Sequence, residues 1–232
     1  MRATVLYSGG KDSTYALHKA VEAGYQVVVL STIIPFYKYS MLYHKPSFNV
    51  VQAQAYSLSI PLESIGVYDE KLELDALRNL LRRVRDRYGV KVLVTGAIAS
   101  NYQRTRFKAI ADELGLELHT PLWGRDPRSY LEELLDYGVR FLITSITSMG
   151  IPLDMLGREI TMSDVERLVK LAEKYGFNPS FEGGDAETIV VDSPLFRYKL
   201  IITGEKNIVS EFEGYFEPLR IKLVEKTYFN LL

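Results

Sequence analysis

Short apolar runs alternate with amphipathic stretches along the first part of the chain. Residues 3–7 and 27–34 are short runs rich in strand-forming side chains, and the first does not alternate with polar positions, which is typical of a strand buried on both faces. Between them, residues 12–23 repeat apolar side chains at helical spacing, and Gly24 follows where a helix end favours glycine. The pattern therefore predicts a β-α-β unit at the start of the chain.

The same alternation continues as far as residue 114. Amphipathic segments and short apolar runs predict helices at 52–58, 72–88 and 105–114 and strands at 62–67 and 90–96. Strands that alternate with helices favour a parallel, doubly wound sheet with helices on both faces. We therefore expect an α/β domain of that class in this part of the chain.

The pattern changes after the segment PLWGRDP, and the later residues predict a smaller α+β portion. Helices are predicted at 129–138 and 163–176 and strands at 139–147, 188–196, 198–203, 208–212 and 219–226. Ser163 and Glu166 have the spacing of a capping box at the start of the second of these helices. The sequence GEKN at 204–207 is typical of a hairpin turn. We place the boundary near residue 125, which gives domains over 1–125 and 126–232.

The sequence SGGKDS, residues 8–13, joins the first strand to the first helix and is the strongest chemical signal in the chain. Open α/β sheets bind ligands beyond the carboxyl ends of their strands, and helix N-termini attract anions. Gly9 and Gly10 allow the backbone to approach a phosphate closely, Lys11 adds a charge, and Ser8 and Ser13 add hydroxyl donors.

Asp12 in this loop is suited to cap the helix or to meet a metal ion such as Mg²⁺. A tight strand-to-helix turn without any ligand is the alternative interpretation of the whole loop, and the combination of six residues makes phosphate binding the better one. Neither the Walker pattern nor G-x-G-x-x-G is present.

Composition and charge exclude several classes of protein. The formal net charge of the 232 residues is -1, which disfavours wholesale nucleic-acid binding. The absence of cysteine excludes disulfides, thiolate nucleophiles and cysteine-ligated metals within this chain. No stretch resembles a secretory signal or approaches the length of a membrane span. We therefore expect a cytoplasmic protein whose oligomeric state, a homodimer included, the sequence leaves open.

Two further stretches carry polar side chains at the expected ligand edge of the sheet. GAIASNYQRTR begins at Gly96, directly after a predicted strand, and places Arg104 in the first turn of the next helix. That arginine either meets an anion or reaches solvent along the helix surface. Ser100, Tyr102 and Gln103 either contact a substrate or cap the helix.

The second stretch, FEGGDAETIVVDSPLF at 181–196, places carboxylates around a glycine pair before a strand. Glu182, Asp185 and Glu187 surround Gly183 and Gly184. Clustered carboxylates of this kind hold Mg²⁺ or orient an amine or ammonium ion, and a polar surface turn is the equally weighted alternative.

The loop SGGKDS after a first strand resembles the PP-loop of the N-type ATP pyrophosphatases, which have the adenine-nucleotide alpha-hydrolase-like fold. Together with GAIASNYQR, LGLELHTPLW, LGR and EGGDAET…DSPLF, it closely resembles the diphthine–ammonia ligases, over residues 4 to about 196. The chain departs from that family at Asp185, where glutamate is usual, and at Ala186, where an aromatic residue is usual. His44 lies in a weaker matching stretch; the resemblance implies that it reaches the substrate, and a loop histidine without a role in the site is the alternative.

The resemblance implies an ATP-dependent ligase that activates the carboxylate of diphthine, a modified histidine on translation elongation factor 2, and amidates it with ammonium. Lys11 and Arg104 would stabilise the phosphates, Glu187 and Asp185 would act on ammonium, and Mg²⁺ would accompany ATP. By analogy of fold, the adenine would lie near Leu30 and Ser31, and Gly96 would border the nucleotide. Aromatic rings would attract the trimethylammonium group of diphthine, with candidates at Tyr39, Tyr43, Tyr102 and Trp123.

Three alternatives remain on the sequence alone. The first is an adenylating enzyme acting on tRNA, which the charge balance disfavours. The second is a ligase for a small carboxylate, which only the family resemblance separates from the diphthine interpretation. The third is a non-catalytic adenine-nucleotide sensor, which gives no reason for the carboxylates of EGGDAET.

Overall fold

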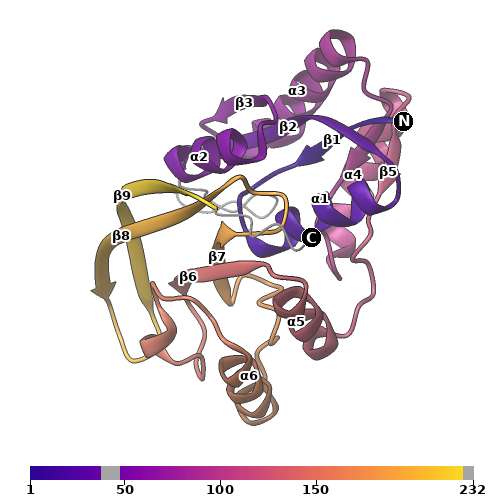
Figure 1. Cartoon of the computed structure of the whole chain (residues 1–232). Coiled ribbons are helices and arrows are strands. Elements are labelled where there is room, and N and C mark those ends of the chain that lie inside the picture. The colour runs from indigo at the N-terminus through magenta and orange to yellow at the C-terminus, as the bar shows by residue number, and fades with distance from the viewer. Residues whose placement is uncertain (38–47, 227–232) are drawn as a thin grey trace.

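The first half of the chain forms a parallel sheet whose strand order is β3-β2-β1-β4-β5 (Figure 1). The computed structural model describes residues 1–37 and 48–226. The five strands are β1 (Arg2–Leu6), β2 (Gln26–Pro35), β3 (Leu62–Val67), β4 (Val92–Val94) and β5 (Glu117–His119). Every pairing in this sheet is parallel, and the order reverses direction at β1. The prediction of a doubly wound α/β sheet is confirmed.

Helices cover both faces of this sheet because its strands are apolar on both sides. The helices are α1 (Lys11–Glu22), α2 (Phe48–Leu58), α3 (Glu73–Tyr88), preceded by the short 3-10 turn η1 (Glu70–Leu72), and α4 (Asn101–Glu113). Alternate side chains of β1 and β4 pack with α1 and α2, whereas those of β2 and β4 that face the other way pack with α3 and α4. Leu93 and Val94, neighbours on β4, lie in these two different clusters.

The second half forms an antiparallel sheet with the order β7-β6-β9-β8, which confirms the predicted α+β portion. Its strands are β6 (Arg140–Ile146), β7 (Ala186–Asp192), β8 (Tyr198–Ile208) and β9 (Gly214–Glu225), and its helices are α5 (Pro127–Asp136), η2 (Leu153–Met155) and α6 (Met162–Tyr175). Figure 1 shows this sheet on the side of the first sheet where α1 and α2 lie.

One hydrophobic cluster joins the two halves. Tyr15 and Leu17 of α1 belong to the same cluster as Leu131 of α5 and Phe141 of β6, and all four side chains are fully buried. Burial of this extent across two sheets fixes the second half against α1. The boundary at residue 125 stays a prediction. Within the described residues, no helix is both long and apolar enough to cross a bilayer.

The predicted hairpin turn at GEKN is wrong. Strand β8 continues through these residues, and the chain reverses at 209–213 instead. Gly204 lies at a β-bulge, where a Cβ atom would sit 2.0 Å from the carbonyl oxygen of Glu217. The glycine therefore marks a close approach of two backbones within a strand pair and does not mark a turn.

Other elements also differ from the sequence prediction, for example β9, which begins at Gly214 and not at residue 219. Helix α4 begins at Asn101, four residues earlier than expected, because the hydroxyl of Ser100 accepts a hydrogen bond from the N–H of Gln103 and caps it. Strand β5 has only three residues and was not predicted. The capping box of α6 is formed by Thr161 and Asp164 and not by Ser163 and Glu166.

Arg158, in the LGR motif, supports the cap of α6. Its guanidinium donates to both carboxylate oxygens of Asp164, at 2.7 and 2.8 Å, and holds the pKa of that carboxyl well below its usual range.

Replacing Arg158 with methionine leaves a buried carboxylate without its charged partner. We expect a loss of about 2 kcal/mol in the free energy of unfolding, measured with urea at pH 7. Arg167→Met is the matched control, because Arg167 reaches only the exposed carboxylate of Asp154.

His18 makes the stability of the fold dependent on pH. Its ring is buried on α1 against Tyr137, and neither ring nitrogen has a partner within the described residues. Burial lowers the pKa of His18 from 6.5 to about 4. The unfolded chain therefore binds a proton more readily than the folded chain between these pH values. Stability is fully present above pH 6.5 and falls as the pH falls towards 4, by about 3 kcal/mol in total.

We expect His18→Leu to remove this pH-dependent contribution to the free energy of unfolding. Urea unfolding at several pH values between 7.5 and 4.5 should show that the free energy of unfolding of the wild type falls relative to that of the variant as the pH falls. A difference that stays constant with pH would contradict the assignment.

Candidate active site

The loop SGGKDS follows β1 and lies between α2 and the free edge of β7. The carbonyl oxygen of Gly9 accepts hydrogen bonds from the side-chain amide of Gln54, at 2.9 Å, and from the N–H of Val190, at 2.9 Å. The N–H of Lys11 donates to the hydroxyl of Thr188 at 3.2 Å. Gly9 has a φ of +79°, which favours glycine at this position. The second half of the chain therefore completes the environment of the loop.

The N-terminus of α1 has donors available for an anion. No side chain caps this helix, and within the described residues the N–H groups of Asp12 and Ser13 have no acceptor. The hydroxyls of Ser8 and Ser13 lie 3.2 Å apart beside them. Unsatisfied N–H groups at the start of a 12-residue helix attract negative charge. The arrangement can hold a phosphate group.

Lys11 is buried and points toward the second half of the chain. Its ammonium donates to both carboxylate oxygens of Asp12, at 2.9 and 3.0 Å, and to the carbonyl oxygen of Ser180 at 2.6 Å. The hydroxyl of Tyr130 also donates to Asp12, at 2.5 Å. Burial, followed by the charge of Asp12, raises the pKa of Tyr130 well above 10, which keeps this hydroxyl a donor.

The segment that receives Lys11 contains a strained residue. Phe181 has a φ of +65°, a value that residues with a side chain rarely adopt, and it is buried beneath the Lys11 ammonium at 5.3 Å. Backbone strain of this kind concentrates at functional sites. Sequence reasoning missed Ser180, Phe181 and Tyr130, because no local pattern distinguishes them from ordinary loop and helix residues.

The glycine pair and its carboxylates form a turn that enters β7. Gly183 and Gly184 have φ values of +93° and +89°, and Glu182 before them is half-buried. Both carboxylate oxygens of Asp185 are engaged, one by the hydroxyl of Ser148 and the other by the N–H of Asn178 at 3.0 Å. Asp185 therefore ties three segments together. Glu187 is half-buried on β7, opposite Ser145 on β6.

The stretch that begins at Gly96 packs against the loop. A Cβ atom at Gly96 would lie 2.8 Å from the nitrogen of Ser13, so only glycine fits against the start of α1. Farther along, the guanidinium of Arg104 lies 4.4 Å over the ring of Trp123, and that of Arg106 lies 3.4 Å over the ring of Tyr102. The two described rings that were expected to attract a cation therefore already carry an arginine.

The expected adenine contacts lie in the middle of a strand. Leu30 and Ser31 are fully buried, and β2 continues to Pro35. The N–H of Leu30 donates to Pro61, and the carbonyl oxygen of Ser31 accepts from Tyr7. Their backbone groups are therefore already paired inside the sheet, four residues before β2 ends, and the adenine contacts at these two residues stay a prediction. His44, Tyr39 and Tyr43 lie outside the described residues.

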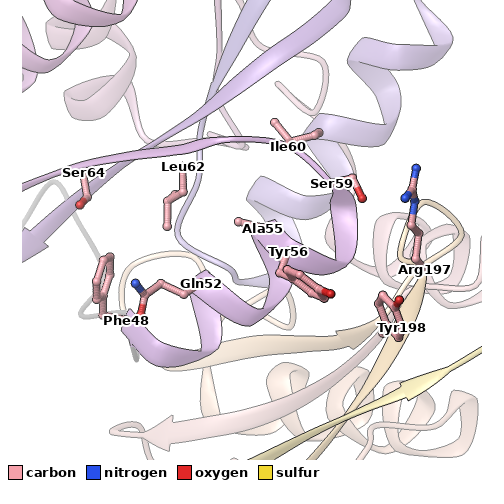
Figure 2. Close-up of a pocket in the computed structure, with 10 residues that line it drawn as sticks. All are labelled: Phe48, Gln52, Ala55, Tyr56, Ser59, Ile60, Leu62, Ser64, Arg197 and Tyr198. Atoms are coloured by element: carbon pink, nitrogen blue, oxygen red, sulfur yellow. The ribbon is translucent and has the colours of Figure 1, made fainter.

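A cavity of about 670 Å³ lies on the other face of α2. Figure 2 shows Phe48 and Tyr56 along this helix face, with Arg197 and Tyr198 at one end of the cavity. None of the residues that line it belongs to the loop, to the stretch after β4 or to the turn before β7. The cavity is therefore separate from the arrangement around Lys11.

The described side chains do not form a metal cage. Within residues 1–37 and 48–226, no group of three or more His, Asp or Glu side chains is arranged to hold a metal ion. Asp12, the expected Mg²⁺ ligand, is occupied by Lys11 and Tyr130. A Mg²⁺ ion that arrives with nucleotide phosphates needs only one or two protein carboxylates, and Asp12 is the carboxylate within the loop itself.

The doubly wound sheet and the SGGKDS loop at the uncapped helix define a PP-loop nucleotide-binding α/β protein. Family models described as the diphthamide synthase N-terminal domain and the diphthamide synthase C-terminal domain match residues 1–118 and 126–224. The chain belongs to the diphthamide synthase family.

Curated relatives agree with this family. The chain is 30% identical over 243 residues to a diphthine–ammonia ligase of Schizosaccharomyces pombe, covering 97% of this chain and 40% of that protein. It is 27% identical over 246 residues to the human diphthine–ammonia ligase, covering 97% and 91% of the two chains. A solved structure from Methanocaldococcus jannaschii, described as a predicted subunit of tRNA methyltransferase, has a TM-score of 0.43 at 17% identity over 84% of this chain and 98% of that one, too distant to support a conclusion.

Proposed function

We propose that this chain is an ATP-dependent ligase that converts the diphthine carboxylate of translation elongation factor 2 to an amide with ammonia. The observation that carries the proposal is the contact between the loop and β7, where the N–H of Lys11 donates to Thr188, the neighbour of Glu187. A phosphate-binding helix end and a carboxylate-bearing strand are thereby held side by side, and family membership gives the arrangement its chemistry.

In the proposed first step, a carboxylate oxygen of diphthine attacks the α-phosphorus of ATP, and the bond to pyrophosphate breaks. The N–H groups of Asp12 and Ser13 stabilise the charge that develops on the phosphates. Lys11 contributes its ammonium by exchanging the Ser180 carbonyl for a phosphate oxygen. Arg104 lies on the exposed surface of α4, where it supports the phosphates or the acceptor protein. A Mg²⁺ ion bound with ATP would be held by the phosphates and by the carboxylate of Asp12, and it would shield the phosphate charge.

In the second step, ammonia attacks the acyl carbon and AMP leaves. Glu187 receives the proton that ammonium must lose before its nitrogen can act as a nucleophile. Asp185 positions the turn that carries Glu182, Gly183 and Gly184 toward the acceptor. Since this chain has no cysteine for a glutaminase site, the nitrogen comes from free ammonium or from a partner protein.

Ser100, Tyr102, Gln103 and His44 complete the proposed surface for the acceptor protein. In this proposal, residues 1–125 bind ATP and contribute these four side chains to the acceptor surface, and residues 126–232 form the rest of that surface.

The test is to incubate the protein with ATP, Mg²⁺ and ammonium, with and without elongation factor 2 that carries diphthine. The proposal expects AMP and pyrophosphate only with the factor, together with a peptide mass change from carboxylate to amide. AMP without a change in the factor would redirect the activity to tRNA or a small carboxylate. Tight ATP binding without any AMP would favour the nucleotide sensor.

A further inference from the structure

Gln54 connects three elements at the centre of the molecule. It lies on α2, its side chain is fully buried, and both protons of its amide are used. One is donated to the carbonyl oxygen of Gly9 at 2.9 Å and the other to that of Val190 at 2.7 Å. A single side chain therefore fixes the loop and the edge of β7 relative to each other.

The orientation of this amide is determined by its surroundings. Both neighbours are carbonyl oxygens, so the amide nitrogen must face them, and the opposite orientation would bring oxygen against oxygen. This orientation costs stability, because the side-chain oxygen Oε1 of Gln54 is buried without a hydrogen-bond partner within the described residues. A Cβ atom at position 9 would lie 2.4 Å from this oxygen, so Gly9 and Gln54 fit each other closely. Leaving an acceptor unpaired costs stability, which points to a role beyond packing.

We infer that Gln54 is a positioning residue that aligns the phosphate-binding loop with the strand carrying Thr188 and Glu187. This inference rests on the proposed function. Gln54 does not touch the N–H groups of Asp12 and Ser13, which would bind the phosphates. Its loss therefore leaves the affinity for ATP largely intact and disturbs the alignment of ATP with the acceptor and with Glu187. A displacement of about 1 Å in such an alignment costs on the order of 10²-fold in rate.

The test compares Gln54→Met with Ser57→Ala. Methionine preserves the volume and removes both donors. Ser57 is equally buried on the same helix and also joins α2 to the second half, since its hydroxyl donates to the carbonyl oxygen of Tyr198 at 2.7 Å. It does not contact the loop, so Ser57→Ala measures the effect of loosening the two halves alone.

For Gln54→Met we expect kcat for AMP formation to fall about 10- to 100-fold, with KM for ATP changing less than about threefold. Ser57→Ala should keep kcat within about threefold of wild type. Gln54→Glu places a carboxylate against two carbonyl oxygens at neutral pH, and protonation restores one donor. Its kcat, relative to wild type at each pH, should therefore recover as the pH is lowered.

A second readout does not depend on the acceptor. Amide hydrogen exchange of β7 should slow when ATP binds to the wild-type protein, and this protection should be lost in Gln54→Met while calorimetry shows that ATP still binds. Equal protection in wild type and Gln54→Met would overturn the inference, as would equal losses of kcat in Gln54→Met and Ser57→Ala. A wild-type protein that makes no AMP with diphthine would refute the proposed function, and the exchange measurement would still decide the role of Gln54.

Discussion

Replacing Lys11 with methionine is expected to lower the rate of AMP formation by two to three orders of magnitude. Methionine keeps most of the apolar length of the side chain but removes the charge beside the loop. In the structure that charge is held by Asp12 and by the carbonyl oxygen of Ser180, close to the unsatisfied N–H groups of α1. The measurement is the release of AMP and pyrophosphate in the presence of elongation factor 2 bearing diphthine.

Lys19→Met provides the matched control for this variant. Lys19 lies on the same helix and pairs with Glu22 and Glu133, away from the loop. The Lys19→Met variant should form AMP at a rate within a few-fold of wild type. If Lys11→Met retains more than about a tenth of the wild-type rate while binding ATP normally, the ammonium of Lys11 has a structural role between the two halves and no role in the reaction.

The second large effect is expected for Glu187→Gln, which should separate the two proposed steps. Glutamine keeps the shape of the side chain on β7 but accepts protons poorly. Formation of the amide should fall at least about 100-fold, since ammonium loses its base. Exchange of labelled pyrophosphate into ATP, which requires only the first step, should remain within about tenfold of wild type when the diphthine factor is present.

Glu205→Gln, on the exposed strand β8, controls for the general loss of a carboxylate and should change neither activity. A Glu187→Gln variant that loses pyrophosphate exchange together with amide formation would place Glu187 in the first step. Full amide formation by this variant would exclude it as the base.

The sequence was sufficient to predict the order of layers, because strands such as 27–34 are apolar on both faces and helices such as 72–88 have one apolar face. The sequence was less informative where contacts with distant residues determine the local secondary structure. Strand β5 is three residues long and gives no periodic signal. Gly204 has the neighbours of a turn residue but lies at a bulge, where the partner strand and not the local sequence explains the glycine.

The candidate site shows the same difference between residues with a local sequence signal and residues whose role depends on distant contacts. SGGKDS and the turn at Gly183 and Gly184 are visible in the sequence because they need glycine for local reasons. The partners of the loop are not recognisable as partners, because Gln54 and Ser180 carry no motif and Thr188, although it ends EGGDAET, lies far from the loop along the chain. Ser100 was an ambiguous residue, and its hydrogen bond to Gln103 makes it a helix cap.

The docking of the loop onto β7 has a consequence for the chain during its synthesis on the ribosome. The carbonyl oxygen of Gly9 bonds to Val190 and the N–H of Lys11 to Thr188, and both partners are made far later in translation than the loop. A nascent chain that ends before β7 therefore has the SGGKDS loop without its partners on that strand. These contacts can form only after residue 190 has been made and has left the ribosome, so shorter products would lack them.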